Sequence, residues 1–150
     1  MSQRDPIRIY VTHAWEESDD YLRVFEYLES ARNFFYGNLA APKRRPAGGP
    51  EAEREELRRQ MAHAEVIIAL SSLAETHLDQ LLFQLNWAKS CNRPVILLPC
   101  FGREVPRPKA LEGLVHDTVA WDERALSDAA RRQARHEDTA RWDTIEFKLD

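Results

Sequence analysis

Continuous apolar runs alternate with amphipathic segments along most of this chain of 150 residues. The runs are short, rich in β-branched residues and bounded by polar residues or prolines, a pattern typical of strands buried on both faces of a sheet. They predict strands at Ile7–Thr12, Glu65–Leu70 and Arg93–Cys100. A weaker strand signal lies at Phe34–Leu39, which is aromatic and interrupted by Gly37, and a shorter strand is predicted around Thr118–Ala120.

The segments between these runs repeat apolar residues at the spacing of a helix, as Leu22 and Phe25 do in the first of them. Ser18 or Asp19 is the expected N-cap of that helix, and Asp122 is the expected N-cap of the last one, because these side chains accept hydrogen bonds from unpaired backbone N–H groups. The pattern predicts helices at Asp19–Asn33, Glu51–His63, His77–Cys91 and Asp122–Glu137.

The length is enough for one domain and too short for two ordinary ones, so we expect a single domain over residues 1–150. Prolines and glycines gathered between about residues 40 and 53 predict a mobile loop. A C-terminal helix and tail are expected over about residues 122–150, where the alternating stretch Trp142–Leu149 forms either a terminal strand or a docked tail.

Strands that alternate with helices predict an α/β fold of three layers, with a flavodoxin-like, five-stranded and mainly parallel sheet of order 2-1-3-4-5. Ligands of such folds bind outside the carboxyl ends of the strands, where the strand order reverses. Here that place is the crevice between the ends of the first and third strands. The residues expected to bind substrate there are Thr12, His13, Ala14, Trp15, Ser71, Asp79 and Gln80.

Charge and composition narrow the range of partners. The formal net charge is −4 and the charges are interspersed, which gives no reason to expect a nucleic acid. No apolar run approaches the roughly 20 residues of a membrane span and no secretory signal is recognisable, so we expect no membrane partner and a cytoplasmic location. The five histidines have no metal-binding spacing, so no metal is expected. Cys91 and Cys100 are interpreted as small buried side chains.

Three stretches of the chain resemble TIR-like domains, in particular the bacterial kind of the Thoeris antiphage-defence system. The first strand and its loop read IRIYVTHAWEESDDY, the third strand and its approach read HAEVIIALSS, and the next helix and strand read LDQLLFQLNWAKSCNRPVILL. Their order and spacing agree with the family over roughly Ile7 to Trp121.

The resemblance implies a TIR-like domain that cleaves the nicotinamide–ribose bond of NAD. NAD would be the substrate, and no tightly bound cofactor is implied. In Thoeris-like members the product is a signalling nucleotide that diffuses to an effector protein, and TIR-like domains also associate into homo-oligomers. A carboxylate suits this reaction, because breaking an N-glycosidic bond builds positive charge on the ribose.

The position of the family's catalytic glutamate is occupied here by Gln84, when the motif is aligned on its Ala-Lys and Arg-Pro pairs. The resemblance assigns the catalytic position to Gln84, but an amide carries no charge that could offset a developing cation. Three explanations remain open. Gln84 is an engineered replacement that binds substrate without turning it over, or the chain is a naturally inactive member of the family. In the third, another acid such as Asp79 or Glu75 does the catalysis. A further alternative is that Gln84 merely faces solvent from its helix.

Three functions follow from these alternatives. The first is an NAD-processing enzyme of bacterial antiphage defence. The second is a catalytically silent TIR-like module that binds a nucleotide or a protein partner. The third is an enzyme that resembles nucleoside deoxyribosyltransferases, which carry a glutamate in a similar helix.

Overall fold

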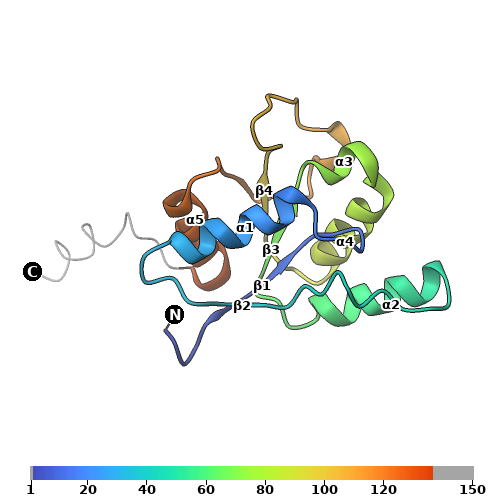
Figure 1. Ribbon diagram of the computed structural model, residues 1–150, viewed down its shortest axis with the longest axis horizontal. Coiled ribbons are helices and arrows are strands. Elements are labelled where there is room, and N and C mark those ends of the chain that lie inside the picture. Colours follow the sequence, from blue (N-terminus) through green and yellow to red (C-terminus); the bar gives the residue numbers. More distant parts are fainter. Residues whose placement is uncertain (1, 137–150) are drawn as a thin grey trace, which may run out of the picture.

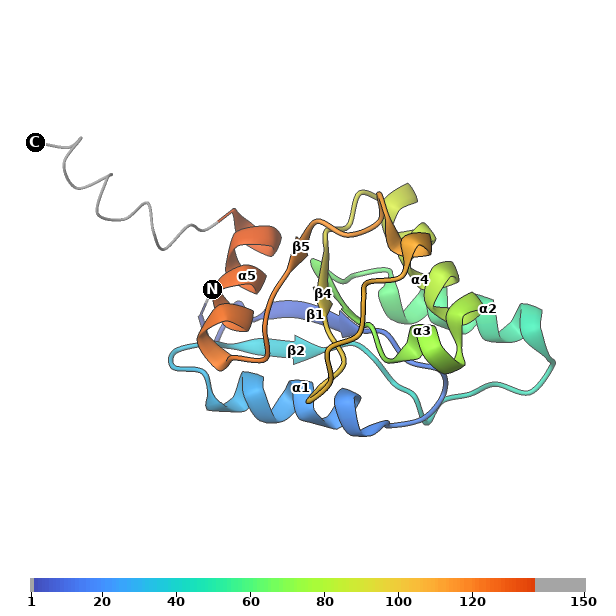
Figure 2. The same ribbon diagram turned by 90° about the horizontal axis from the view of Figure 1, so that it is seen from above.

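The structure is a computed structural model and describes residues 2–136. Its described part contains one five-stranded sheet in which every neighbouring pair is parallel, in the order β2-β1-β3-β4-β5 (Figures 1 and 2). The expected flavodoxin-like α/β topology is confirmed. The strands are β1 (Ile7–Val11), β2 (Tyr36–Asn38), β3 (Val66–Leu70), β4 (Val95–Leu98) and β5 (Asp117–Thr118).

Helices cover both faces of this sheet (Figure 2). The helices α1 (Asp19–Ser30) and α5 (Glu123–Arg135) lie side by side on one face. The opposite face is covered by α2 (Pro50–Met61), the single turn α3 (Leu73–Thr76) and α4 (Leu78–Ser90). Among residues 2–136, none of the helices is long and apolar enough to cross a membrane.

The central strands lie wholly inside the molecule, because both faces of the sheet are covered. Every residue of β3 and β4 is buried, as the continuous apolar runs predict. β2 and β5 form the edges and are short and only partly buried. The side chains of the core therefore fix β1, β3 and β4, and the carboxyl ends of these strands provide the firmest base for a site.

The ends of several helices and strands can be compared with expectation, and some of them differ. Ser18 caps α1 by accepting a bond from the Tyr21 amide, and Asp122 caps α5 by accepting one from Ala125, so both expected caps are confirmed. The turn α3 was not expected, and β5 ends at Thr118, where the sequence predicted its start. The stretch Trp142–Leu149 lies outside the described residues.

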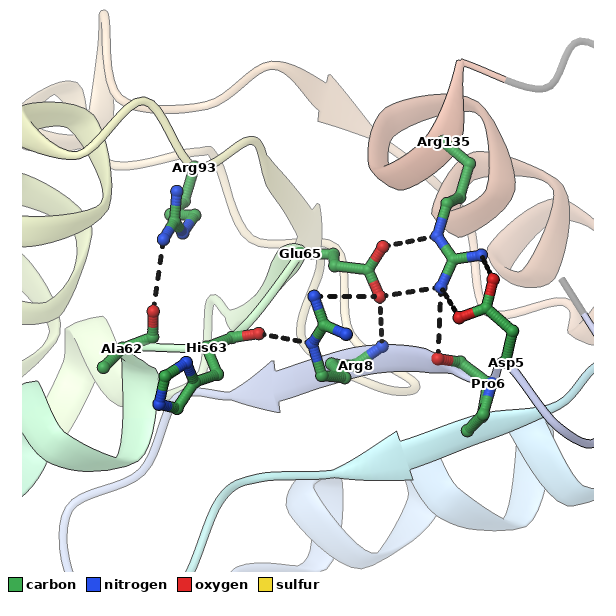
Figure 3. A network of polar contacts seen from close by, with 8 residues as sticks. All are labelled: Asp5, Pro6, Arg8, Ala62, His63, Glu65, Arg93 and Arg135. Atoms are coloured by element: carbon green, nitrogen blue, oxygen red, sulfur yellow. Dashed lines mark hydrogen bonds and ion pairs between the residues drawn. The ribbon is translucent and has the colours of Figure 1, made fainter.

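One arginine joins the end of α5 to the residues that precede β1 and β3 (Figure 3). Arg135 donates to both carboxylate oxygens of Glu65, to both of Asp5 and to the carbonyl oxygen of Pro6. Glu65 also accepts from the backbone amide of Arg8 at 2.9 Å. Burial by itself raises the pKa of Glu65, but the bonds from Arg135 and from the Arg8 amide outweigh burial and hold that pKa below its usual value.

Removing this arginine tests how much the contact stabilises the fold. We expect Arg135→Gln to lower the free energy of unfolding by about 2 kcal/mol, because it breaks several charge-assisted hydrogen bonds at a site where the Arg135 and Glu65 side chains are only 19% and 14% exposed. The matched control is Arg124→Gln on the same helix, whose side chain is 87% exposed and should change stability by less than about 0.5 kcal/mol. Urea unfolding measures both. Equal losses of stability in the two variants would contradict the stabilising role assigned to Arg135.

Candidate functional site

A cavity of about 200 Å³ opens beside the carboxyl end of β1, between α2 and α4. Trp15 contributes to its wall from the loop that follows β1. The remaining lining residues come from the two helices: Pro50, Glu53, Arg54 and Leu57 from α2, and Asp79, Gln80 and Phe83 from α4. The cavity lies where parallel α/β sheets usually bind ligands.

The expected substrate-binding residues divide into two groups. Trp15, Asp79 and Gln80 line the cavity. Thr12, His13 and Ala14 belong to the loop after β1, but they are buried and do not line the cavity, and Ser71 is also absent from its wall. Thr12 instead accepts a hydrogen bond from the backbone amide of Leu70, which joins the ends of β1 and β3.

Gln84 is fully buried behind the cavity, so the alternative that it faces solvent is wrong. Its Oε1 accepts from the Tyr10 hydroxyl at 2.6 Å and from the His13 backbone amide at 3.2 Å. Its Nε2 donates to the carbonyl oxygens of His13 and Gln80, both at 2.9 Å. A backbone N–H can only donate and a carbonyl can only accept, so these partners fix which end of the amide is which.

The amide of Gln84 therefore has all its hydrogen-bonding capacity used inside the protein. A glutamate at the same position would place an ionised oxygen against the carbonyl oxygens of His13 and Gln80, with no proton to share. Burial raises the pKa of Tyr10 well above its ordinary value, with a further contribution from nearby Tyr21, so Tyr10 stays a neutral donor to Gln84. The pocket behind the loop is suited to an amide.

His13 links the same loop to α2. Its Nδ1 accepts from the Trp15 backbone amide at 3.1 Å, so the proton of the neutral ring is on Nε2, which donates to Gln60 Oε1 at 2.9 Å. Gln60 also exchanges two hydrogen bonds with the backbone of Ala41, at 2.9 and 3.1 Å. Burial lowers the pKa of His13, and the hydrogen bond to Gln60 only partly opposes this effect.

The backbone of Trp15 is held in a left-handed conformation, with φ at 66°. Such values are uncommon for a bulky side chain and cost about 1–2 kcal/mol. The bond from its amide to His13 holds it there, and its ring lies edge-on to the imidazole with 5.0 Å between the centroids. Strain of this kind often accompanies a site in which a side chain must point in one direction.

Polar groups are distributed unevenly around the cavity. Glu53 contacts Arg45 at 3.3 Å, and Arg54 contacts Glu51 at 3.6 Å. Asp79 is exposed in the first turn of α4 and forms no ion pair within residues 2–136. The Oε1 atom of Gln80 is covered and has no hydrogen-bond partner in the described structure.

The other acid considered from the sequence, Glu75, does not line this cavity. It binds Arg103, at 2.6 Å, and accepts from the Cys100 thiol at 3.2 Å. Arg103 lowers the pKa of Glu75, while burial and the neighbouring carboxylate raise the pKa of Cys100. Cys100 therefore has little thiolate character. No group of His, Cys, Asp and Glu side chains suited to a metal ion occurs among the described residues.

Sequence reasoning missed the residues that orient the loop and much of the α2 wall. Gln60 follows Leu57 at helical spacing and is 8% exposed, so it is a polar residue on the buried face of α2. That position was its only signal. Phe83 packs against the core and also lines the cavity. No known protein family matches the chain, and no curated protein matches its sequence.

The strain at Trp15 can be measured with two substitutions that both remove the ring. Glycine ordinarily lowers stability relative to alanine, but at a positive φ the order reverses. We expect Trp15→Gly to be more stable than Trp15→Ala by about 1 kcal/mol in urea unfolding. The same pair at Glu16, an exposed neighbour, should show no such reversal. Alanine as the more stable variant at residue 15 would mean that the loop relaxes.

The lowered pKa of His13 makes stability depend on pH. As the pH falls, the unfolded chain takes up the His13 proton near pH 6.5, before the folded protein does. The stability contributed by neutral His13 is thus complete above that pH and decreases below it, by up to about 1.4 kcal/mol per pH unit. Urea unfolding at pH 7.5 and 5.5 should show a smaller decrease for His13→Gln than for the parent. The control His63→Gln, at an exposed residue, should match the parent. An unchanged decrease in His13→Gln would contradict this assignment.

Proposed function

We propose that this chain is a TIR-like nucleotide-binding module of bacterial antiphage defence that holds NAD in the cavity beside Trp15 without cleaving it. The observation that carries the proposal is the cavity itself, at the carboxyl end of β1, with a strained tryptophan in its wall and polar groups from α2 and α4 around it. The resemblance supplies the identity of the nucleotide.

The aromatic part of the wall suits one ring of the ligand. Trp15 and Phe83 both line the cavity, and aromatic faces of this kind stack on nucleobase or nicotinamide rings. A volume of about 200 Å³ is below the roughly 300–1,000 Å³ of complete ligand pockets. It therefore takes the nicotinamide and part of its ribose, and the rest of the dinucleotide lies across the rim.

The polar part of the wall suits the sugar and the phosphates. A carboxylate such as Asp79 accepts hydrogen bonds from ribose hydroxyls. A hydroxyl could also supply the donor that Gln80 Oε1 lacks, after a small shift of that side chain. Arg54 is exposed at the rim, where a guanidinium can bind a phosphate with two parallel hydrogen bonds.

Absence of cleavage is proposed because Gln84 is neutral, buried and fully hydrogen-bonded. It has no free acceptor for a ribose hydroxyl and no charge for a developing cation. In this proposal Gln84 is a positioning residue, which fixes the loop that presents Trp15. Gln84→Glu is then expected to lose stability rather than to gain turnover, in contrast to a simple catalytic replacement.

A second candidate is an NAD-cleaving enzyme that makes a signalling nucleotide for an effector. One observation favours it: Asp79 places a carboxylate without an ion-pair partner, among the described residues, at the wall of the same cavity. In that case Asp79 stabilises the positive charge that develops on the ribose. The two candidates share the binding site and differ only in turnover.

Calorimetric titration with NAD, and chromatography of the NAD afterwards, separate these functions. We expect saturable binding with no release of nicotinamide. Trp15→Gly should weaken binding by roughly 5- to 150-fold, the value of one stacked base. Phe101→Ala is the control, since it removes a half-exposed aromatic ring that does not line the cavity.

Each remaining outcome identifies a different function. Nicotinamide release that is lost in Asp79→Asn would establish the enzyme in place of the silent module. No NAD binding by the folded chain would overturn the proposal and leave a protein-interaction module, whose self-association chromatography can detect. Cleavage of deoxynucleosides but not NAD would establish the deoxyribosyltransferase-like alternative. If Gln84→Glu released nicotinamide and the parent chain did not, residue 84 would be the catalytic position.

A further inference from the structure

A second and larger cavity, of about 650 Å³, lies at the other end of the strands, where β1, β3 and β4 begin. Its walls come from the start of β1, the turn between α2 and β3, the end of α4, the segment before β5 and the end of α5. The side chains on which the argument depends are Arg8, His63, Glu65, Lys89, Arg93 and His116.

Cationic groups outnumber anionic ones in this wall. Arg8, Lys89 and Arg93 are permanent cations at neutral pH, and Glu65 is the only carboxylate among the described lining residues. Glu65 is already bound by Arg135, which ties α5 to the sheet (Figure 3). Within residues 2–136, neither Lys89 nor Arg93 forms an ion pair with a carboxylate. The excess is local, since the whole chain carries a net charge of −4.

The ends of three helices account for only part of this excess. α2, α4 and α5 all finish beside the cavity, and each helix C-terminus carries about half a negative charge. Together they offset about one and a half cations, and Glu65 offsets at most another. Roughly half a positive charge remains, before any contribution from the imidazoles.

Arg93 is held in place here by two backbone carbonyl oxygens. It donates from Nη1 to the carbonyl oxygen of Cys91 at 3.2 Å and from Nη2 to that of Ala62 at 3.1 Å. Figure 3 shows Arg93 on the side of the network away from Arg135. Its Nε is covered and has no acceptor in the described structure. A small rotation toward an anion in the cavity would give this donor a partner.

An imidazole adds a hydrogen-bond donor to the same wall. The Nδ1 atom of His116 accepts from the Val95 backbone amide at 3.0 Å, which leaves the N–H on Nε2. No group of side chains suited to a metal ion occurs among the described residues. His63 and His116 are therefore better suited to donate hydrogen bonds than to bind a metal ion.

We propose that this second cavity binds a small molecule that carries a phosphate group. Guanidinium and ammonium groups are the side chains that proteins use for phosphate, and here they come from β1, α4 and the turn before β4. The volume lies within the range of complete ligand pockets and exceeds the size of a phosphate ion, so the remainder of the molecule also fits. The site is separate from the NAD cavity and shares no lining residue with it.

Pyrophosphate and inorganic phosphate are the probes, titrated calorimetrically into the full chain at constant ionic strength. We expect saturable binding with a Kd between about 10 µM and 1 mM. Lys89→Gln should weaken it roughly fivefold, as expected for the loss of one unit charge about 4 Å away in water. Lys109→Gln removes the same charge from an exposed residue outside the cavity and should change nothing.

A second variant places a negative charge in the cavity and breaks no described side-chain contact. Asn92 lines it in a left-handed conformation, with φ at 55°, which aspartate also tolerates. Asn92→Asp should weaken binding roughly fivefold, since one added negative charge acts with about the strength of one lost positive charge, with thermal unfolding confirming that the variant folds.

Three results would overturn the proposal. The first is an absence of saturation up to about 10 mM of both probes. The second is equal weakening by Lys89→Gln and Lys109→Gln, which would indicate diffuse attraction only. The third is pyrophosphate binding that is lost in Trp15→Gly and kept in Asn92→Asp, because the probe would then occupy the NAD cavity. If NAD does not bind in the first cavity, the proposal for this second cavity is unaffected.

Discussion

The four hydrogen bonds of one buried amide are the constraint on which the candidate site depends. Gln84 joins α4 to the loop after β1 through the backbone amide and carbonyl of His13, and it also bonds to the Tyr10 hydroxyl in β1 and to the Gln80 carbonyl within α4. The removal of one partner from such a buried set costs about 1–3 kcal/mol, because the other groups cannot find water. The loop is therefore fixed by polar contacts that only an amide can satisfy.

From that constraint the orientation of Trp15 follows in a short chain of contacts. Gln84 fixes the backbone of His13, His13 accepts the amide of Trp15, and Gln60 fixes the tautomer of His13. The left-handed backbone of Trp15 is the cost of this arrangement, and the presence of Trp15 in the cavity wall is its result. A mechanism that needed His13 as a general acid or base would have to break this chain.

The sequence predicted the sheet because continuous apolar runs are specific for strands covered on both faces, as β3 and β4 are. It also placed Trp15, Asp79 and Gln80 at the rim, since topology alone brings these positions together. It did not reveal which polar side chains turn inward. Helical spacing alone does not show that Gln84 and Gln60 are buried and paired, because the partner that each of them shares, His13, lies 71 and 47 residues away in the chain. Periodicity describes one element at a time and carries no information on such pairs.

The contact between Arg135 and Asp5 joins residues that are 130 positions apart in the chain. Closing so long a segment is costly in chain entropy until other elements have brought the two ends together. β1, β3 and α5 must already be docked before the guanidinium can reach both carboxylates. The contact therefore forms late in folding and acts mainly on the rate of unfolding, so that it prolongs the lifetime of the native state without hastening its appearance.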